Sequence, residues 1–334
     1  MKISASIYSD SRNDLAQTIS ALDAHQVDLF HVDCNDDLSV FDDILALRKI
    51  SNIPVDLHII TPTPSKYYQR LIDVPVEYVT FQLEPLVEPL IWPSELTAAK
   101  GVAITTPTSV DAFDAYTTCD FILIMATVPG QSGGVFDKEN FKKIRTFRKR
   151  YPNKSIHVDG GVNGEVSFIL RNMGVSTAVS GSYLFKGPSI GHALMNLTTR
   201  NHASAYQIAD FMMPLEECPL VHMSTCTTES ILEVIESGSL GFCLVIDEQD
   251  ALVGIVSSAD IRKALLNQLK NNQAITPESL VNRHPLTISA KQSVIDLLQV
   301  LKRTSFPVMY LPVVNEQHQA VGIINFVNLI KAEL

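Results

Sequence analysis

The sequence predicts an α/β protein of two domains, a closed barrel of eight parallel strands with surrounding helices followed by a smaller α+β domain. The chain has 334 residues, and at about 100–200 residues per domain this is room for two hydrophobic cores. Residues 1–200 alternate short β-rich apolar runs with amphipathic segments, the pattern of repeated βα units around a parallel sheet. Residues 213–334 contain two similar units with a period of about 65 residues.

Eight strands are predicted in the first domain because each run is short and rich in β-branched and aromatic residues. In order they are ISASIY, DLFHVD, PVDLHII, EYVTFQ, GVAITT, DFILIM, SIHVD and STAVSG. Amphipathic spacing between them predicts helices over 13–26, 40–50, 64–72, 138–151, 163–173 and 190–197. The gap after the fourth strand carries three prolines in PLVEPLIWPSEL, so any helix there must be short or broken. Eight such βα units predict a (β/α)8, or TIM, barrel over residues 1–200.

The second domain begins after residues 201–212, which interrupt the βα rhythm and are predicted to form a linker. Its two repeats, at about 213–270 and 280–334, each contain a helix, two strands around a turn, and a closing helix. The turns carry the related motifs VIDEQDALVGI and VVNEQHQAVGI. Neither repeat has enough apolar strand surface to form a core alone, so we expect the two to pack together.

Composition narrows the classes of partner. The 26 Lys and Arg against 36 Asp and Glu give a net charge of −10, so no basic field attracts nucleic acid or an anionic membrane. The basic stretch 142–154 falls on a predicted barrel helix, where we expect it to be a solvated outer face. The five cysteines are scattered and form no Cys-x-x-Cys pair, which argues against disulfides and a cysteine zinc site. With no leader-like start and no apolar run of about 18 residues, we expect a cytoplasmic protein outside any membrane.

Four residues at predicted strand ends indicate a metal site. His31 and Asp33 are two apart on one strand, so their side chains share a face. His58 and Asp159 end two other strands, and the carboxyl ends of barrel strands meet at one mouth. Any one of these residues alone is more often structural; together they predict one divalent metal ion per barrel, with Zn, Fe, Mn and Co all suited to the ligand types.

Glycines follow the last three predicted strands. Backbone N–H groups approach an anion closely at glycine, so these loops are candidates for binding a phosphate. The residues are Gly130, Gly133 and Gly134, then Gly160 and Gly161, then Gly181 with Ser182. A tight turn explains any single glycine equally well. The position of these glycines beside the predicted metal site is what indicates a phosphate site.

The motifs SASIYSD, HVDCND, VDLHI, IMATVPGQSGGVF, VDGGVN and SGSYLF together give residues 1–200 a resemblance to ribulose-phosphate 3-epimerases. The resemblance implies that Asp33 and Asp159 bind the metal and act as the acid/base pair. It also implies that His31 and His58 complete the ligand set and that Ser6 lies beside the substrate.

The chain also departs from that family's pattern. Methionines that cap the intermediate are replaced by Asn35 and Ile60, and only Met125 is kept. Gln82 stands where a histidine is usual, and Val128 where an asparagine is usual. The phosphate loop reads PGQSGG in place of PGFGGQ. These changes predict an altered sugar substrate or, alternatively, lost turnover.

The second domain resembles a cystathionine-β-synthase (CBS) domain pair, and GIVSSADIRKAL is similar to the pair attached to arabinose-5-phosphate isomerases. The resemblance implies that Ser257 and Asp260 contact the ribose of an adenine or cytidine nucleotide. The equivalent residues of the second repeat are Asn325 and Asn328, which puts a second nucleotide site in doubt. The alternative is a purely structural or dimerising module.

We therefore expect an isomerase that abstracts the C3 proton of a phosphorylated ketose, with a metal stabilising the negative charge that forms on oxygen. The substrate would be D-ribulose 5-phosphate or a related phosphorylated ketose, and the second domain would respond to a nucleotide. We expect a homo-oligomer. The alternative function is a non-catalytic, nucleotide-sensing binding protein with a degenerate barrel.

Overall fold

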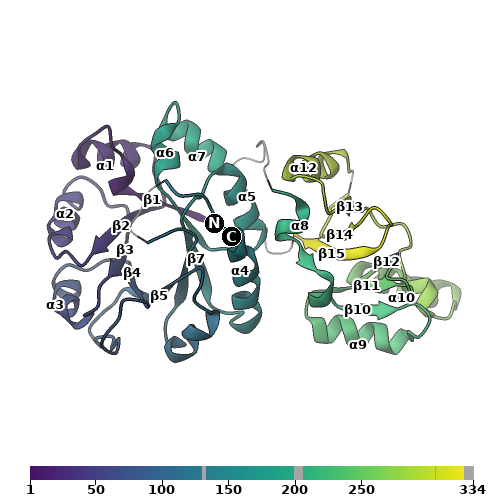
Figure 1. Ribbon diagram of the computed structural model, residues 1–334. Coiled ribbons are helices and arrows are strands. Elements are labelled where there is room, and N and C mark those ends of the chain that lie inside the picture. The colour runs from purple at the N-terminus through teal and green to yellow at the C-terminus, as the bar shows by residue number, and fades with distance from the viewer. Residues whose placement is uncertain (130–132, 199–205, 305, 327–334) are drawn as a thin grey trace. The chain divides into compact units, whose positions relative to one another are not determined.

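The computed structural model describes residues 1–129, 133–198, 206–304 and 306–326, which fall into two separately packed units. The barrel strands and their helices form the first unit, and the repeats form the second (Figure 1). The domain boundaries at 200 and 213 remain predictions. In the structure, Ile208 and Ala209 already donate backbone hydrogen bonds to Gln292 and Ala290 of the second unit.

The first unit is a closed barrel of eight parallel strands in chain order, as predicted, and β1 closes the ring by pairing with β8. The strands are β1 (Lys2–Ser6), β2 (Leu29–Asn35), β3 (Val55–Ile60), β4 (Tyr78–Gln82), β5 (Ala99–Thr105), β6 (Phe121–Met125), β7 (Ser155–Asp159) and β8 (Thr177–Ser180). Both faces are covered, so the strands are almost wholly buried, which explains their continuous apolar runs.

Helices surround the barrel (Figure 1). They are η1 (Ile7–Ser9), α1 (Leu15–Ala24), α2 (Val40–Leu47), α3 (Ser65–Asp73), η2 (Val110–Tyr116), α4 (Glu139–Arg150), α5 (Gly164–Asn172), α6 (Ser182–Lys186) and α7 (Ile190–Thr198). In α4, Phe141, Ile144 and Phe147 are buried at helical spacing, and the basic residues of the helix are half-buried or exposed. Residues 83–98 are described throughout and contain no helix, whereas the sequence, with its three prolines, still allowed a short or broken one or one beginning at Pro93.

The second unit consists of two small sheets and their helices. Its elements are α8 (Ile208–Phe211), β9 (Met213–Pro214), η3 (Leu215–Glu217), β10 (Leu220–His222), α9 (Thr228–Gly238), β11 (Phe242–Ile246), β12 (Leu252–Ser257), α10 (Ser258–Asn271), α11 (Pro277–Leu280), β13 (Ile288–Ser289), α12 (Val294–Arg303), β14 (Tyr310–Val314) and β15 (Ala320–Asn325). The sheet orders are β10-β11-β12 and β13-β14-β15-β9.

The two repeats share a buried cluster, as the sequence predicts, and the first repeat also has a cluster of its own. Phe242 and Leu244 of the first repeat and Ile323 of the second belong to the same buried cluster. Backbone hydrogen bonds also join the two turns, from the N–H of Leu252 to the carbonyl of His318. Each repeat therefore covers apolar surface that the other leaves exposed. Among the described residues, no helix is both long and apolar enough to cross a membrane.

Candidate active site

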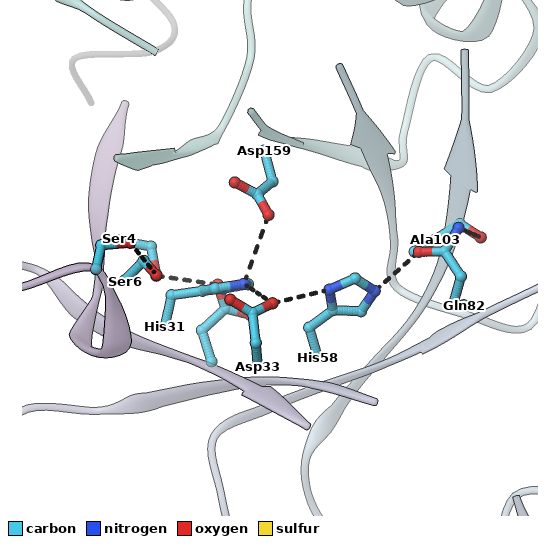
Figure 2. Close-up of polar contacts among 10 residues, drawn as sticks. Ser4, Ser6, His31, Asp33, His58, Gln82, Ala103 and Asp159 are labelled. Atoms are coloured by element: carbon cyan, nitrogen blue, oxygen red, sulfur yellow. Dashed lines mark hydrogen bonds and ion pairs between the residues drawn. The ribbon is translucent and has the colours of Figure 1, made fainter. Parts of the chain in front are cut away.

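Four side chains converge from three strands at the mouth of the barrel (Figure 2). They are His31 and Asp33 on β2, His58 on β3 and Asp159 at the end of β7, and one ligand atom of each lies within 4.8 Å of the others. Asp33 is the register partner of His58. Its Oδ1 accordingly lies 3.4 Å from Nδ1 of His58 and 3.3 Å from Nε2 of His31. Nε2 of His31 is 3.7 Å from Oδ2 of Asp159.

A second carboxylate, Asp56, orients His31 from behind. Nδ1 of His31 lies 3.0 Å from Oδ2 of Asp56, which also accepts a hydrogen bond from the hydroxyl of Ser4 at 3.0 Å. All three side chains are buried. A carboxylate only accepts hydrogen bonds, so Nδ1 of His31 carries a proton, and Nε2 is the nitrogen that faces Asp33 and Asp159.

The second imidazole faces the site through its other nitrogen. Nε2 of His58 lies 2.9 Å from Oε1 of Gln82, and Nδ1 is the atom nearest Asp33 (Figure 2). His58 and Gln82 are both buried, at 0% and 1% exposure. The two histidines are therefore held by different partners and present opposite ring nitrogens to the same point.

The two site carboxylates differ in pKa. Burial raises the pKa of both, but for Asp33 the charge and hydrogen bond of His31, together with the charge of His58, outweigh burial and hold the pKa well below its usual range. For Asp159 burial dominates, and with the charge of Asp33 it raises the pKa to about 6. Burial lowers the pKa of His31, but the charges of Asp33 and Asp56 outweigh this and raise it well above its ordinary value. Without a metal ion, the two carboxylates are therefore not equivalent.

The residues fit a divalent metal ion. Within the described part of the chain, Nδ1 of His58 is a buried nitrogen with no hydrogen-bond partner, a costly arrangement that a cation would satisfy. Two carboxylates and two imidazoles, with no thiolate among them, suit Zn, Fe(II), Mn or Co. The predicted ligand set is therefore brought together by the fold.

A cavity of about 280 Å³ opens beside Asp33 and Asp159. Every predicted substrate or phosphate residue that the structure describes lines it, namely Ser6, Met125, Gly133, Gly134, Gly160, Gly161, Gly181 and Ser182. Gly130 lies outside the described residues. The cavity also contacts Tyr8, Ser9 and Thr127, which the sequence analysis did not single out.

Tight backbone packing explains two of these glycines. Gly160 and Gly161 have φ of +111° and +66°, and a Cβ at Gly161 would lie 2.2 Å from the backbone nitrogen of Phe136. Only glycine fits there whether or not a phosphate binds. Gly181 has no positive φ, yet a Cβ would lie 2.4 Å from Oγ of Ser9 at the cavity wall. The convergence of the three loops on one cavity therefore indicates an anion site, whereas no single glycine does so.

The departures from the family pattern occupy different places. Asn35 lines the cavity, and Gln82 contacts His58. Ile60 is partly buried at the end of β3, and Val128 is 60% exposed. Gln82 is thus the departure that bears directly on a candidate metal ligand.

In the second unit, Ser257 and Asp260 bond to each other. Oδ2 of Asp260 accepts the N–H of Ser257 at 3.0 Å and its hydroxyl at 2.6 Å. This is a capping arrangement at the start of α10. Asn325 ends β15, and Asn328 lies outside the described residues. The predicted nucleotide contact and a structural cap therefore use the same two side chains.

Sequence reasoning missed Asp56, although a signal was present. Asp56 precedes His58 by two residues on β3, as His31 precedes Asp33 on β2, and residues two apart on a strand share a face. The missing information was the register that places Asp56 beside His31.

Each unit of the chain is similar to a family of known proteins. The model of the ribulose-phosphate 3-epimerase family matches residues 2–185, more than half of the chain, and the CBS domain model matches 224–267 and 278–334. A crystal structure of CBSX2 in complex with AMP is 27% identical, covers 39% of this chain and 96% of its own, and has a TM-score of 0.33.

Among curated proteins, the chain is similar to ribulose-phosphate 3-epimerases from several organisms. The cytoplasmic isoform of Oryza sativa is 26% identical over 212 residues, which cover 59% of this chain and 92% of that protein. The enzyme of Methanocaldococcus jannaschii is 29% identical over 213 residues, covering 59% and 89%. The chain belongs to the ribulose-phosphate 3-epimerase family, and the protein is an epimerase, an enzyme of the isomerase class.

Proposed function

We propose that the protein is a metal-dependent 3-epimerase that interconverts D-ribulose 5-phosphate and D-xylulose 5-phosphate, or a related phosphorylated ketose. The observation that carries the proposal is the convergence of His31, Asp33, His58 and Asp159 beside a cavity. The names of the curated relatives support ribulose 5-phosphate as the substrate. The polar Asn35 in the cavity wall favours testing related ketoses alongside it.

Asp33 and Asp159 are the proposed acid/base pair. Asp33 lies two residues before the end of β2, and Asp159 ends β7. Strands β1 and β8 lie between β2 and β7 around the ring, so the two carboxylates can flank a flat intermediate from two sides. One carboxylate removes the C3 proton, and the other returns a proton to the opposite face, which inverts the carbon. General acid–base assistance of this kind contributes about 10²–10⁴ in rate.

His31, Asp33, His58 and Asp159 would hold the metal ion. A bound divalent cation would supply Lewis-acid stabilisation for the negative charge that forms on the substrate oxygen. Asp56 and Gln82 keep the two imidazoles oriented from behind. The phosphate would lie against the loops that contain Gly133, Gly161 and Gly181, where backbone N–H groups can approach it.

The second domain is proposed as a regulatory module that binds an adenine or cytidine nucleotide through Ser257 and Asp260. Its resemblance to the CBS pair of arabinose-5-phosphate isomerases also belongs to this proposal, as do a homo-oligomeric state and a cytoplasmic location. Membership of an epimerase family favours an enzyme over the alternative of a non-catalytic nucleotide sensor. A nucleotide at 100 times its dissociation constant should stabilise the protein by about 2.7 kcal/mol, which thermal-shift screening detects.

Turnover in deuterium oxide tests the proposal. NMR should show D-ribulose 5-phosphate, or one of a panel of phosphorylated ketoses, converting to its C3 epimer with deuterium at C3. Metal-free protein should be inactive, and activity should return with one of Zn, Fe, Mn or Co. A panel in which no ketose gains deuterium at C3, with metal-loaded protein, contradicts the proposed function.

A further inference from the structure

We propose that Gln82 is a positioning residue that fixes the proton of His58 on Nε2 and so keeps the lone pair of Nδ1 available to a metal ion. The inference rests on the proposed metal-dependent function and deepens it. Gln82 ends β4, its side chain is 1% exposed, and its Oε1 lies 2.9 Å from Nε2 of His58 (Figure 2). It is the hydrogen-bond partner of His58 on the side of the ring that faces away from Asp33.

The orientation of the Gln82 amide is fixed by two oxygens on its far side. Nε2 of Gln82 donates to the backbone carbonyl of Ala103 at 3.3 Å and to Oε2 of Glu84. A carbonyl and a carboxylate both only accept, so the NH2 group must face them and Oε1 must face His58. Turning the amide over would bring three oxygens together on one side.

Glu84 is itself held as an acceptor by the backbone. Its Oε1 accepts the N–H of Thr105 at 2.8 Å and the hydroxyl of Thr105 at 2.8 Å, and also the hydroxyl of Thr108. Burial raises the pKa of Glu84, but the hydrogen bonds from Gln82, Thr105 and Thr108 outweigh burial and lower it. Glu84 is therefore a carboxylate at neutral pH. The backbone N–H of Thr105 can only donate, so Glu84 must accept from it.

These contacts form a chain in which His58 donates to Gln82 and Gln82 donates to Glu84, while Glu84 also accepts the N–H of Thr105 from the other side. Because Oε1 of Gln82 can only accept, Nε2 of His58 must carry the proton. In a neutral imidazole the other nitrogen then has the lone pair. That nitrogen, Nδ1, is the buried atom without a hydrogen-bond partner among the described residues, and it lies 3.4 Å from Asp33.

Two single variants break this chain in different ways. Gln82→Met keeps an unbranched side chain of similar length and removes the hydrogen bonds to His58, Glu84 and Ala103. Glu84→Gln touches neither His58 nor the other candidate ligands, yet it reverses the direction of the chain. Its oxygen still accepts from Thr105, so its NH2 faces Gln82, whose amide then turns over and donates to Nε2 of His58. The proton of His58 moves to Nδ1, where it blocks metal binding.

The matched control is Glu95→Gln, which removes the same charge from an exposed position of the segment that follows β4. The double variant Gln82→Glu/Glu84→Gln should restore the proton position of His58. In it, residue 82 again accepts a hydrogen bond from His58, and residue 84 donates one to residue 82. Fluorescence of the single tryptophan, Trp92, verifies that each barrel is folded.

Zinc affinity is measured by competition with a chromophoric chelator, and the proton position by long-range ¹H–¹⁵N spectra of metal-free protein labelled at histidine. The spectra are recorded at about pH 9, above the ordinary imidazole pKa of ~6.5. We expect the zinc Kd to rise about 10–100-fold in Gln82→Met and Glu84→Gln, as is typical when a partner behind a metal ligand is lost. Glu95→Gln should match the wild type, the double variant should recover affinity, and wild-type His58 should carry its proton on Nε2.

Folded Gln82→Met and Glu84→Gln proteins that bind zinc as tightly as the wild type, with the His58 proton still on Nε2, would overturn the inference. Wild-type protein that binds no metal at all would instead contradict the proposed metal dependence. In that case the metal-free spectra of the same variants still decide whether Gln82 sets the proton position of His58.

Discussion

Replacing Asp56 by alanine should destabilise the barrel far more than replacing it by asparagine. Oδ2 of Asp56 accepts hydrogen bonds from Nδ1 of His31 and Oγ of Ser4, both at 3.0 Å, and none of the three residues is more than 2% exposed. Alanine leaves two buried donors unpaired, at about 1–3 kcal/mol each, or about 2–6 kcal/mol of unfolding free energy in total. Asparagine keeps an oxygen for both donors and loses only the charge, at about 1–2 kcal/mol.

Urea unfolding of metal-free protein measures this difference, with fluorescence of Trp92 as the signal. Trp92 is the only tryptophan in the chain and packs against Phe81 with ring centroids 5.5 Å apart, so the signal reports the barrel and not the second unit. This separation matters because a two-domain chain need not unfold in one step. If Asp56→Ala and Asp56→Asn lie within about 0.5 kcal/mol of each other, Asp56 does not hold His31 and Ser4 through its hydrogen bonds.

Three further predictions concern stability. Gly161→Ala should cost more than about 1 kcal/mol of barrel stability, because φ is +66° and Cβ would lie 2.2 Å from the backbone nitrogen of Phe136. Gly187→Ala, whose Cβ would have its nearest atom at 4.0 Å, should be nearly neutral in the same urea titration. Burial lowers the pKa of His31, but the charges of Asp33 and Asp56 outweigh burial and raise it. The stability that the charged imidazole contributes should therefore be complete below the unfolded pKa of ~6.5 and lost as pH rises through the folded pKa. A stability difference between metal-free wild type and His31→Gln that does not change with pH would contradict this. Asp260→Ala should cost the second unit about 1 kcal/mol by removing the cap on Ser257 and should abolish any nucleotide-induced thermal shift, while an unchanged shift would exclude Asp260 from the nucleotide site.

The barrel and the four converging ligands follow from local patterns. Strand runs of period two place His31 and Asp33 on one face, and the rule that strand ends share a mouth brings His58 and Asp159 to the same point. The shared face and the shared mouth both follow from the order of residues along each strand. The same is true of the prolines that exclude a helix between β4 and β5.

Residues that act from behind the ligands could not be predicted in this way. Asp56 reaches His31 because β2 and β3 pair with those residues side by side, and Gln82 reaches His58 across the β3–β4 pair. Such contacts depend on the register between strands, which the sequence of one strand does not specify. The pair Ser257 and Asp260 shows a second limit, since its spacing of three residues is shared by a nucleotide contact and a helix cap.

The measurement that tests the central claim most directly is hydrogen exchange at C3 by Asp33→Asn and Asp159→Asn, each at saturating metal in deuterium oxide. Two carboxylates on opposite faces predict that neither variant inverts C3. Each variant keeps one carboxylate, so it should exchange the C3 hydrogen of one epimer at most. That epimer should differ between the two variants. Near-native epimerisation by either variant would contradict the proposal that Asp33 and Asp159 form the acid/base pair.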